Sequence, residues 1–121
     1  PLGMTINMDG TAIMQVVATV FIAGCAGYTV TPGQLVVVAL LALLASVGTP
    51  AAPGAGAVIL FTILSGVGFV NDSALLAYSL ILAINRPIEM LVTSLNVVGD
   101  AVASICVAKS EGLLDEKKFN A

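Results

Sequence analysis

The stretch Gly48-Thr49-Pro50-Ala51-Ala52-Pro53-Gly54-Ala55-Gly56 decides the fold, because it cannot continue a helix. Two apolar runs flank it, Leu35 to Val47 and Ala57 to Val70, and each is shorter than the roughly 20 residues that a membrane-crossing helix needs. Two half-length helices around a Pro/Gly tip are typical of a re-entrant hairpin, whose non-helical backbone lies against protein or a water-filled cavity. An ordinary loop between two short spans is the alternative.

Outward from this hairpin, the composition is that of a membrane protein. Of the 121 residues, 59% are hydrophobic and 9% are charged, whereas soluble domains contain about 25% charged residues. The two cysteines are isolated and histidine is absent, so a transition-metal site is not expected. No basic patch indicates a nucleic-acid partner. The acids and bases before Lys109 are Asp9, Asp72, Arg86, Glu89 and Asp100.

Polar interruptions divide the rest of the chain. The run from Ala12 to Ala26 is apolar except for Gln15 and Thr19, and residues 74–108 are expected to form one long helix. Asn71-Asp72-Ser73 supplies its N-cap. The predicted fold class is therefore an all-α membrane protein with broken helices, multi-pass, in contact with membrane lipid. Residues 112–121 form a polar tail, whose lysines favour a cytoplasmic C-terminus.

The polar residues of the long helix share one face. At about 100° per residue, they fall within less than a quarter-turn: Asn85, Glu89, Thr93, Asn96 and Asp100. A charged side chain at membrane depth costs at least about 2.5 kcal/mol, and such residues face the bundle interior and mark an ion or substrate route. A purely structural polar seam is the alternative. Arg86 is expected to pair with Glu89 along the helix.

A second polar cluster, Thr5-Ile6-Asn7-Met8-Asp9-Gly10-Thr11, resists a regular helix. Unwound carbonyl groups together with Asn and Asp oxygens suit a hard cation such as sodium. A solvated loop before the first helix would explain the same polarity.

Three ordered motifs resemble the dicarboxylate/amino acid:cation symporters, the family that includes the glutamate transporters. The cluster 5–11 looks like the signature of the family's unwound seventh helix. Ala45-Ser46-Val47-Gly48-Thr49 with Pro53-Gly54-Ala55-Gly56 resembles the tip of its second re-entrant hairpin. Asn96-Val97-Val98-Gly99-Asp100, followed by Val107-Ala108-Lys109-Ser110-Glu111, resembles its eighth helix.

The resemblance implies that residues 1–111 are the C-terminal transport core of a longer symporter. Residues 1–27 would be the second half of broken helix seven, 35–70 the second hairpin and 74–108 helix eight. The start at Pro1, without an initiator Met, fits the interior of a longer protein. The resemblance also implies a missing N-terminal half, a homotrimer when the protein is full length, and a place in the plasma (inner) membrane.

The resemblance implies sodium as the coupling ion and no organic cofactor. One sodium would bind the carbonyls of Gly3, Asn7 and Asn96 and the carboxylate of Asp100. A second would lie among the carbonyls of Thr5, Ser46, Val47 and Thr49 when the hairpin closes. A third would use Asn7 and Asp9, with its other ligands in the missing part.

The same resemblance implies an amino acid site. The carboxylate of the substrate would meet Asn96 and the hairpin tip, which contributes Ser46, Gly48, Pro53 and Gly54. Its amino group would meet Glu89 and Thr93. Transport would proceed by alternating access, with the hairpin as the gate.

One departure from the family pattern concerns Val92, at the edge of the polar stripe. Carriers of acidic amino acids have Arg at this position, and a buried carboxylate without a partner costs several kcal/mol. We therefore expect a neutral amino acid as substrate. Glu89 also replaces the family's Asp, and Pro50 removes an amide donor from the tip.

Three alternatives remain beside this interpretation. The chain could belong to a carrier of acidic amino acids or C4-dicarboxylates in the same family. It could be a non-transporting membrane fragment. An intramembrane aspartyl protease using Asp9 and Asp100 is disfavoured, because Val97 replaces a glycine of that motif. An enzyme is therefore not expected.

Overall fold

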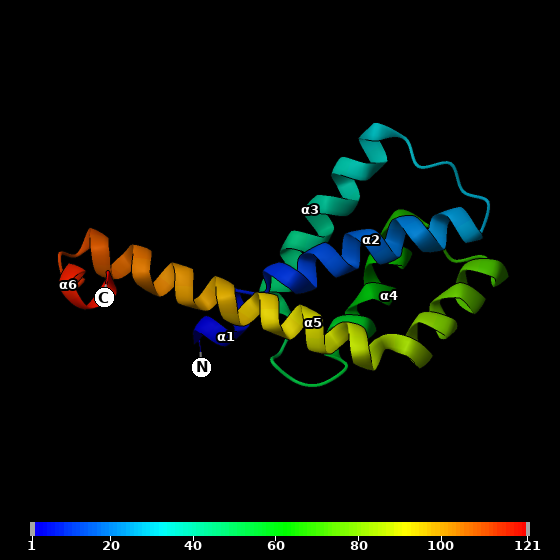
Figure 1. The fold of residues 1–121 in the computed structure, drawn as a ribbon. Helices are drawn as coiled ribbons and strands as arrows, with labels where there is room; N and C mark the ends of the chain where they lie inside the picture. The colour runs from blue at the N-terminus through cyan, green and yellow to red at the C-terminus, as the bar shows by residue number, and fades with distance from the viewer. Residues whose placement is uncertain (1, 121) are drawn as a thin grey trace.

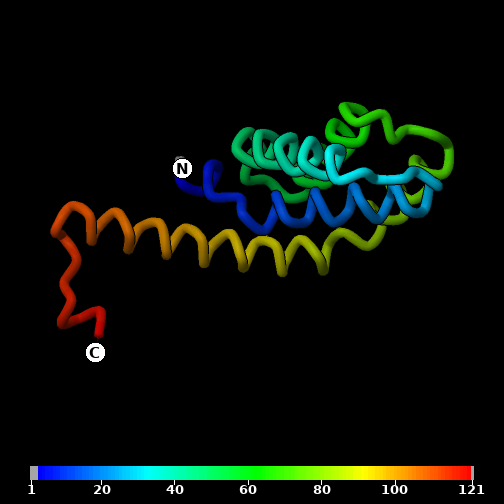
Figure 2. Tube along the Cα trace, turned by 90° about the horizontal axis from the view of Figure 1, so that it is seen from above, coloured from blue at the N-terminus to red at the C-terminus, as the bar shows by residue number. Residues whose placement is uncertain are grey.

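The structure is a computed structural model that describes residues 2–120, and within this range it contains helices and no strand. The elements are α1 (Leu2–Ile6), α2 (Asp9–Cys25), α3 (Pro32–Gly48), α4 (Ala55–Val67), α5 (Asp72–Ser110) and α6 (Glu116–Phe119). Helix α2 lies at the centre and contacts α3, α4 and α5 (Figures 1 and 2). The all-α class predicted from the sequence is confirmed.

The predicted polar cluster contains a short break between α1 and α2. Within the cluster 5–11, only Asn7 and Met8 lie outside the helices. The N–H of Asn7 closes α1 by donating to the Gly3 carbonyl at 3.0 Å. Met8 has φ −107° and ψ 46°, which is not helical. The non-helical backbone is therefore shorter than the seven residues of the cluster, and Asp9 already begins α2.

The hairpin of α3 and α4 has different ends from the predicted range 35–70. Helix α3 begins at Pro32 because Thr31 and Gln34 form a capping box, in which each side chain bonds the other residue's backbone N–H. Helix α4 ends at Val67 because Gly68 has φ +79°, a conformation that favours glycine. Residues 49–54, called the hairpin tip below, join the two helices, which run in opposite directions (Figure 1).

Helix α5 has 39 residues and therefore a length of roughly 58 Å, about twice the hydrocarbon thickness of a bilayer. Asn71 caps it, accepting a hydrogen bond from the N–H of Ala74 at 2.8 Å. The helix bends in its first half and its C-terminal part extends beyond the other helices (Figures 1 and 2). Pro87 lies inside the helix, and a proline bends a helix by removing one hydrogen bond.

Two helical stretches in the described part of the chain are long and apolar enough to cross a membrane, Gly3–Cys25 and Asp72–Ser110. Helices α3 and α4 are apolar but shorter, with 17 and 13 residues. Helices α3 and α4 are short because the tip, with Pro50, Pro53 and Gly54, lies between them and interrupts the helical backbone.

Small residues bring α2 close to its neighbours. Its buried positions are mostly small: Gly10, Thr11, Gln15, Ala18, Thr19, Ile22 and Ala23. Side chains of this size let helix backbones approach each other, which is how helices associate in a membrane that offers no hydrophobic driving force. The core between α2, α4 and α5 is completed by Leu60, Leu64, Phe69, Ala74 and Ala77.

Gly10 is a point of close approach between α2 and α5. A Cβ atom there would lie 2.6 Å from the carbonyl oxygen of Val92 and 3.0 Å from the Cβ of Leu95. We predict that Gly10→Ala destabilises the protein by roughly 1–3 kcal/mol, because α5 must move away from α2. Gly24→Ala, in the same helix with no atom within 4 Å, should be neutral or slightly stabilising. Thermal unfolding of the two purified variants tests this, and equal midpoints would contradict it.

Candidate functional site

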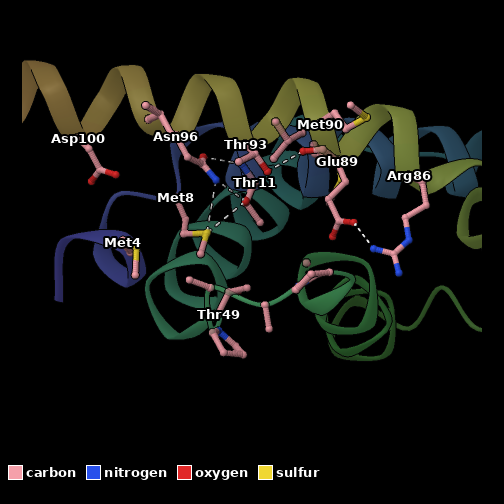
Figure 3. Close-up of a pocket in the computed structure, with 18 residues that line it drawn as sticks. Met4, Met8, Thr11, Thr49, Arg86, Glu89, Met90, Thr93, Asn96 and Asp100 are labelled. Carbon is pink, nitrogen blue, oxygen red and sulfur yellow. Dashed lines mark hydrogen bonds and ion pairs between the residues drawn. The ribbon is translucent and has the colours of Figure 1, made fainter. Parts of the chain in front are cut away.

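One cavity of about 700 Å³ lies between the hairpin tip, the α1–α2 break and the middle of α5 (Figure 3). Most of its lining area is apolar, with a few polar groups among the hydrophobic side chains, as in small-molecule sites. The lining residues from the first two helices are Met4, Met8, Thr11 and Met14. Those from the hairpin are Thr49, Pro50, Ala51, Ala52, Pro53 and Gly56, and those from α5 are Arg86, Glu89, Met90, Val92, Thr93, Asn96, Val97 and Asp100.

Asn96 joins α5 to the beginning of α2. Its Oδ1 accepts from the N–H groups of Gly10 at 2.8 Å and Thr11 at 3.4 Å, which are among the first N–H groups of α2 and have no partner within that helix. Its Nδ2 donates to Thr11 Oγ1 at 3.2 Å and lies 3.5 Å from the sulfur of Met8. Asn96 therefore holds the broken helix against α5, at the place where the sequence predicts ion and substrate contacts.

The carboxylate of Asp100 lies at the same break. Asn7 donates from Nδ2 to Asp100 Oδ1 at 3.0 Å, and a Cβ atom at Gly3 would be 3.6 Å from that oxygen. The structure thus gathers Gly3, Asn7, Asn96 and Asp100, the four residues expected to hold the first sodium. They offer carbonyl, amide and carboxylate oxygens, the ligand types that a hard cation prefers.

Asp9 lies on the other side of the break, against Gly99. A Cβ atom at Gly99 would be only 2.2 Å from Asp9 Oδ2, so glycine at this position leaves room for the carboxylate. Asp9 is exposed, while Asp100 is half-buried. Among the described residues no three His, Cys, Asp or Glu side chains come together, so a cation here would depend on carbonyl and amide oxygens beside one carboxylate.

The hairpin tip is bound to α5 through Glu89. Glu89 Oε1 accepts a hydrogen bond from the backbone N–H of Gly54, and its Oε2 pairs with Arg86 Nη1 at 3.2 Å (Figure 3). The predicted pairing of Arg86 with Glu89 is therefore confirmed. The Glu89 side chain is 21% exposed and that of Arg86 is 73% exposed, so the carboxylate faces the protein and the guanidinium faces outward.

Val92 and Thr93 extend this wall of the cavity. Val92 is 9% exposed and lines the cavity, as the helical wheel predicts. Thr93 donates from Oγ1 to the carbonyl of Glu89 at 2.8 Å, so its hydroxyl oxygen can still accept. Asn85, the first residue of the polar stripe, is buried without lining the cavity.

Some predicted residues lie apart from the cavity. Ser46 is buried and donates from its hydroxyl to the Leu43 carbonyl at 2.9 Å, while Val47 and Gly48 are exposed. None of these three lines the cavity. Thr49 does line it, and its hydroxyl donates to the Ala45 carbonyl at 2.7 Å. Thr5 lies on α1, which packs against α3. The Ser46 carbonyl accepts a hydrogen bond from the N–H of Thr49 at 3.2 Å. This bond closes the last turn of α3.

The sequence arguments missed the methionines. Met4, Met8, Met14 and Met90 all line the cavity, and flexible thioether side chains adapt to ligands of different shape. Only Met4 and Met8, four residues apart, have a spacing that would place them on one face of a helix, and no spacing rule relates them to Met14 on α2 or Met90 on α5. Gln15, treated as an interruption of an apolar run, is fully buried and donates to the Gly56 carbonyl at 3.3 Å.

Comparisons with known proteins point to one family. The model of the sodium:dicarboxylate symporter family matches residues 1–110. Excitatory amino acid transporter 2 of Homo sapiens is 43% identical over 116 residues, which cover 95% of this chain and 20% of that transporter. The excitatory amino acid transporter of Onchocerca volvulus is 44% identical over 105 residues, covering 86% of this chain and 20% of the relative.

A more distant relative gives the same result. Excitatory amino acid transporter 5 of Mus musculus is 38% identical over 104 residues, which cover 86% of this chain and 18% of that transporter. The chain therefore spans about a fifth of the length of these relatives, and the matched part includes the broken helix, the hairpin and α5.

Proposed function

This chain belongs to the sodium:dicarboxylate symporter family, and from this membership and the geometry above we propose that it forms the substrate- and sodium-binding part of a symporter for neutral amino acids. The family and the relatives are transporters, not enzymes. The observation that carries the proposal is the single cavity wall on which Glu89, Thr93 and Asn96 stand beside an apolar Val92.

We propose that sodium binds at the α1–α2 break. The family is named for sodium coupling, and the side chains of Asn7 and Asp100 already bond each other at 3.0 Å. A cation between the Gly3 and Asn96 carbonyls and the Asp100 carboxylate would link α1 to α5. The second site, among Thr5, Ser46, Val47 and Thr49, requires the end of α3 to offer carbonyls that now complete its last turn. The third would use Asn7 and Asp9.

The substrate is proposed to bind across the cavity as a zwitterion. Glu89 and Thr93 would receive its ammonium group, while the Asn96 amide and the N–H of Gly54 would receive its carboxylate. Pro53 has no N–H and would contribute an apolar contact. Ser46, Gly48 and Gly54 would take part only if the tip rearranges, since none of the three lines the cavity now. The side chain of the substrate would lie against Val92 and the methionines, where it finds no unpaired positive charge.

A second candidate is an acidic amino acid. Arg86 lines the cavity and could in principle meet a side-chain carboxylate, although its guanidinium is already paired with Glu89. The Arg86 side chain is 73% exposed and faces outward, whereas the substrate side chain is proposed to lie against Val92, which is 9% exposed. The neutral substrate therefore remains the main proposal.

The wider setting is also part of the proposal. Because the chain matches about a fifth of its relatives, we propose that it works within a longer protein, with an N-terminal half that completes the sites. That protein would be a homotrimer in the plasma membrane, with the hairpin re-entrant and the C-terminus cytoplasmic. A non-transporting fragment would lack these partners and would show no substrate binding.

Competitive uptake tests the substrate class. Cells or vesicles with the full-length protein are given a labelled neutral amino acid and a panel of neutral and acidic competitors. We expect neutral amino acids to compete and aspartate, glutamate and C4-dicarboxylates to compete at least tenfold less well. Saturable uptake of aspartate without any neutral competitor would favour the second candidate.

A further inference from the structure

Three side chains fasten the beginning of α4 to its neighbours. Tyr78 donates from its hydroxyl to the Ala57 carbonyl at 3.1 Å, and Gln15 donates to the Gly56 carbonyl at 3.3 Å. Both are neutral and both bond carbonyl groups of the first turn. Glu89 is different, because it is an acid at the wall of the cavity and it accepts from the N–H of Gly54.

The Gly54 N–H is a backbone donor at the start of α4, between Pro53 and Gly56, which both line the cavity. Gly54 is the N-cap residue of α4 and has φ +84°, and the N–H groups at a helix start have no partner inside the helix. A carboxylate is the natural acceptor at this place, because the helix N-terminus has partial positive charge. In the structure the carboxylate that fills this role is the protein's own Glu89.

Glu89 can reach the tip only because of its length. The residue stands on α5, and its two carboxylate oxygens are divided between Gly54 on the tip and Arg86 on its own helix. An aspartate at the same position would be shorter by one methylene group. It would still present a negative charge to the cavity but would no longer reach the Gly54 N–H.

We propose that Glu89 caps the hairpin tip in the ligand-free protein, and that only a ligand with both an ammonium and a carboxylate group replaces it. The ammonium attracts the Glu89 carboxylate away from Gly54, and the ligand's carboxylate then accepts from the released N–H. The tip thus stays bound to α5 before and after the exchange. This inference rests on the proposed function, since it assumes that the cavity binds an amino acid.

Because of this exchange, a compound with only a carboxylate or only an amine group should bind more weakly than an amino acid. A compound with a carboxylate alone must displace another carboxylate from Gly54, and it leaves Glu89 without the ammonium. A compound with an amine alone takes Glu89 away and leaves the Gly54 N–H without an acceptor, so the tip loses its link to α5. Selectivity for α-amino acids would follow from this exchange as well as from direct contacts.

The test measures the position of the tip in the full-length protein. Cys25 and Cys106, both exposed, are replaced by Ser, and nitroxide labels are placed at Ala51→Cys on the tip and Ser94→Cys on α5. Pulsed electron paramagnetic resonance gives the distance between the labels. In the ligand-free protein we expect Glu89→Asp and Glu89→Gln each to raise the ratio of open to closed tip about tenfold. That factor corresponds to about 1.4 kcal/mol, close to the lower end of the range for a hydrogen bond to a charged group.

The two variants distinguish the role of Glu89 as a cap of the Gly54 N–H from its role as a contact for the ammonium group of the ligand. Glu89→Asp keeps the charge, so saturating neutral amino acid should close its tip again, whereas Glu89→Gln should also bind the amino acid more weakly. In both variants the des-amino analogue should bind about tenfold more tightly than it binds the wild type, because it no longer has to displace the Glu89 carboxylate from Gly54. Tyr78→Phe is the control. It removes a hydrogen bond between neutral groups from the first turn of α4, and any change in the ratio of open to closed tip should be the same with and without ligand.

Equal distance distributions for the wild type and both Glu89 variants without ligand would overturn the inference. Failure of the wild type to bind any amino acid would refute the proposed function instead. The ligand-free distances would then still show whether Glu89 caps the tip, and the exchange with an amino acid would be rejected.

Discussion

Replacing Asp100 with Asn should raise the sodium concentration for half-maximal uptake by roughly 10- to 100-fold. Asp100 is the carboxylate among the ligands expected for the first sodium, and its neighbours Asn7 and Asn96 are neutral. Asn keeps the oxygen that accepts from Asn7 Nδ2 at 3.0 Å, so the local fold should persist while the charge is lost. Charge-assisted interactions contribute about 1.5–3 kcal/mol, and this range gives the predicted factor.

Asp72→Asn is the matched control for this experiment. It removes the same charge from the same helix, but at an exposed position in the first turn of α5, roughly 40 Å along the helix from Asp100. Sodium activation should be unchanged in this variant. The assignment of Asp100 would be refuted by sodium activation curves that coincide for the wild type and Asp100→Asn.

Val92→Arg should shift the preference from neutral to acidic amino acids by at least about tenfold. Val92 is 9% exposed and lines the cavity, so a side-chain carboxylate beside it is buried without a partner in the wild type. A guanidinium at this position offers bidentate pairing with that carboxylate. A neutral substrate offers no partner to the introduced guanidinium, so neutral amino acids should bind this variant more weakly.

Val92→Gln separates charge from size in this comparison. It introduces a long polar side chain without a charge, and it should weaken neutral substrates without creating a preference for acidic ones. Competition by aspartate and by a neutral amino acid is measured for all three proteins. If the wild type already prefers aspartate, or if Arg and Gln act alike, Val92 does not set the substrate class.

The sequence predicts the start of a helix well where a polar cap marks it, but it misses the end of α4 before Gly68 by three residues. Asn71 caps α5 as expected, because its side chain needs only the N–H of Ala74, three residues away. The start of α3 is missed by three residues, since apolar counting begins at Leu35 and overlooks the capping box of Thr31 and Gln34. Capping rules between residues close in sequence are enough to predict such helix starts. Counting apolar residues misplaces the start of α3 because the polar Gln34 belongs to the helix.

The site is predictable only in part, because several of its contacts join distant segments. The stripe on α5 follows from helical periodicity, and Glu89, Thr93, Asn96 and Asp100 do line the cavity. The bond from the Gly10 N–H to Asn96 joins residues 86 positions apart, and no spacing rule indicates it. Asn85 fits the same periodicity but lies outside the lining, since the bend of α5 and the packing of α2 decide which turns reach the cavity.

Sodium-driven accumulation is the measurement that tests the central claim most directly. The purified full-length protein is reconstituted into vesicles, and uptake of a labelled neutral amino acid is followed with an inward sodium gradient, without a gradient, and with potassium in place of sodium. The account predicts transient accumulation above equilibrium only with the sodium gradient, abolished or strongly reduced in Asp100→Asn. Accumulation that is the same without sodium, or that occurs for aspartate and for no neutral amino acid, would contradict it.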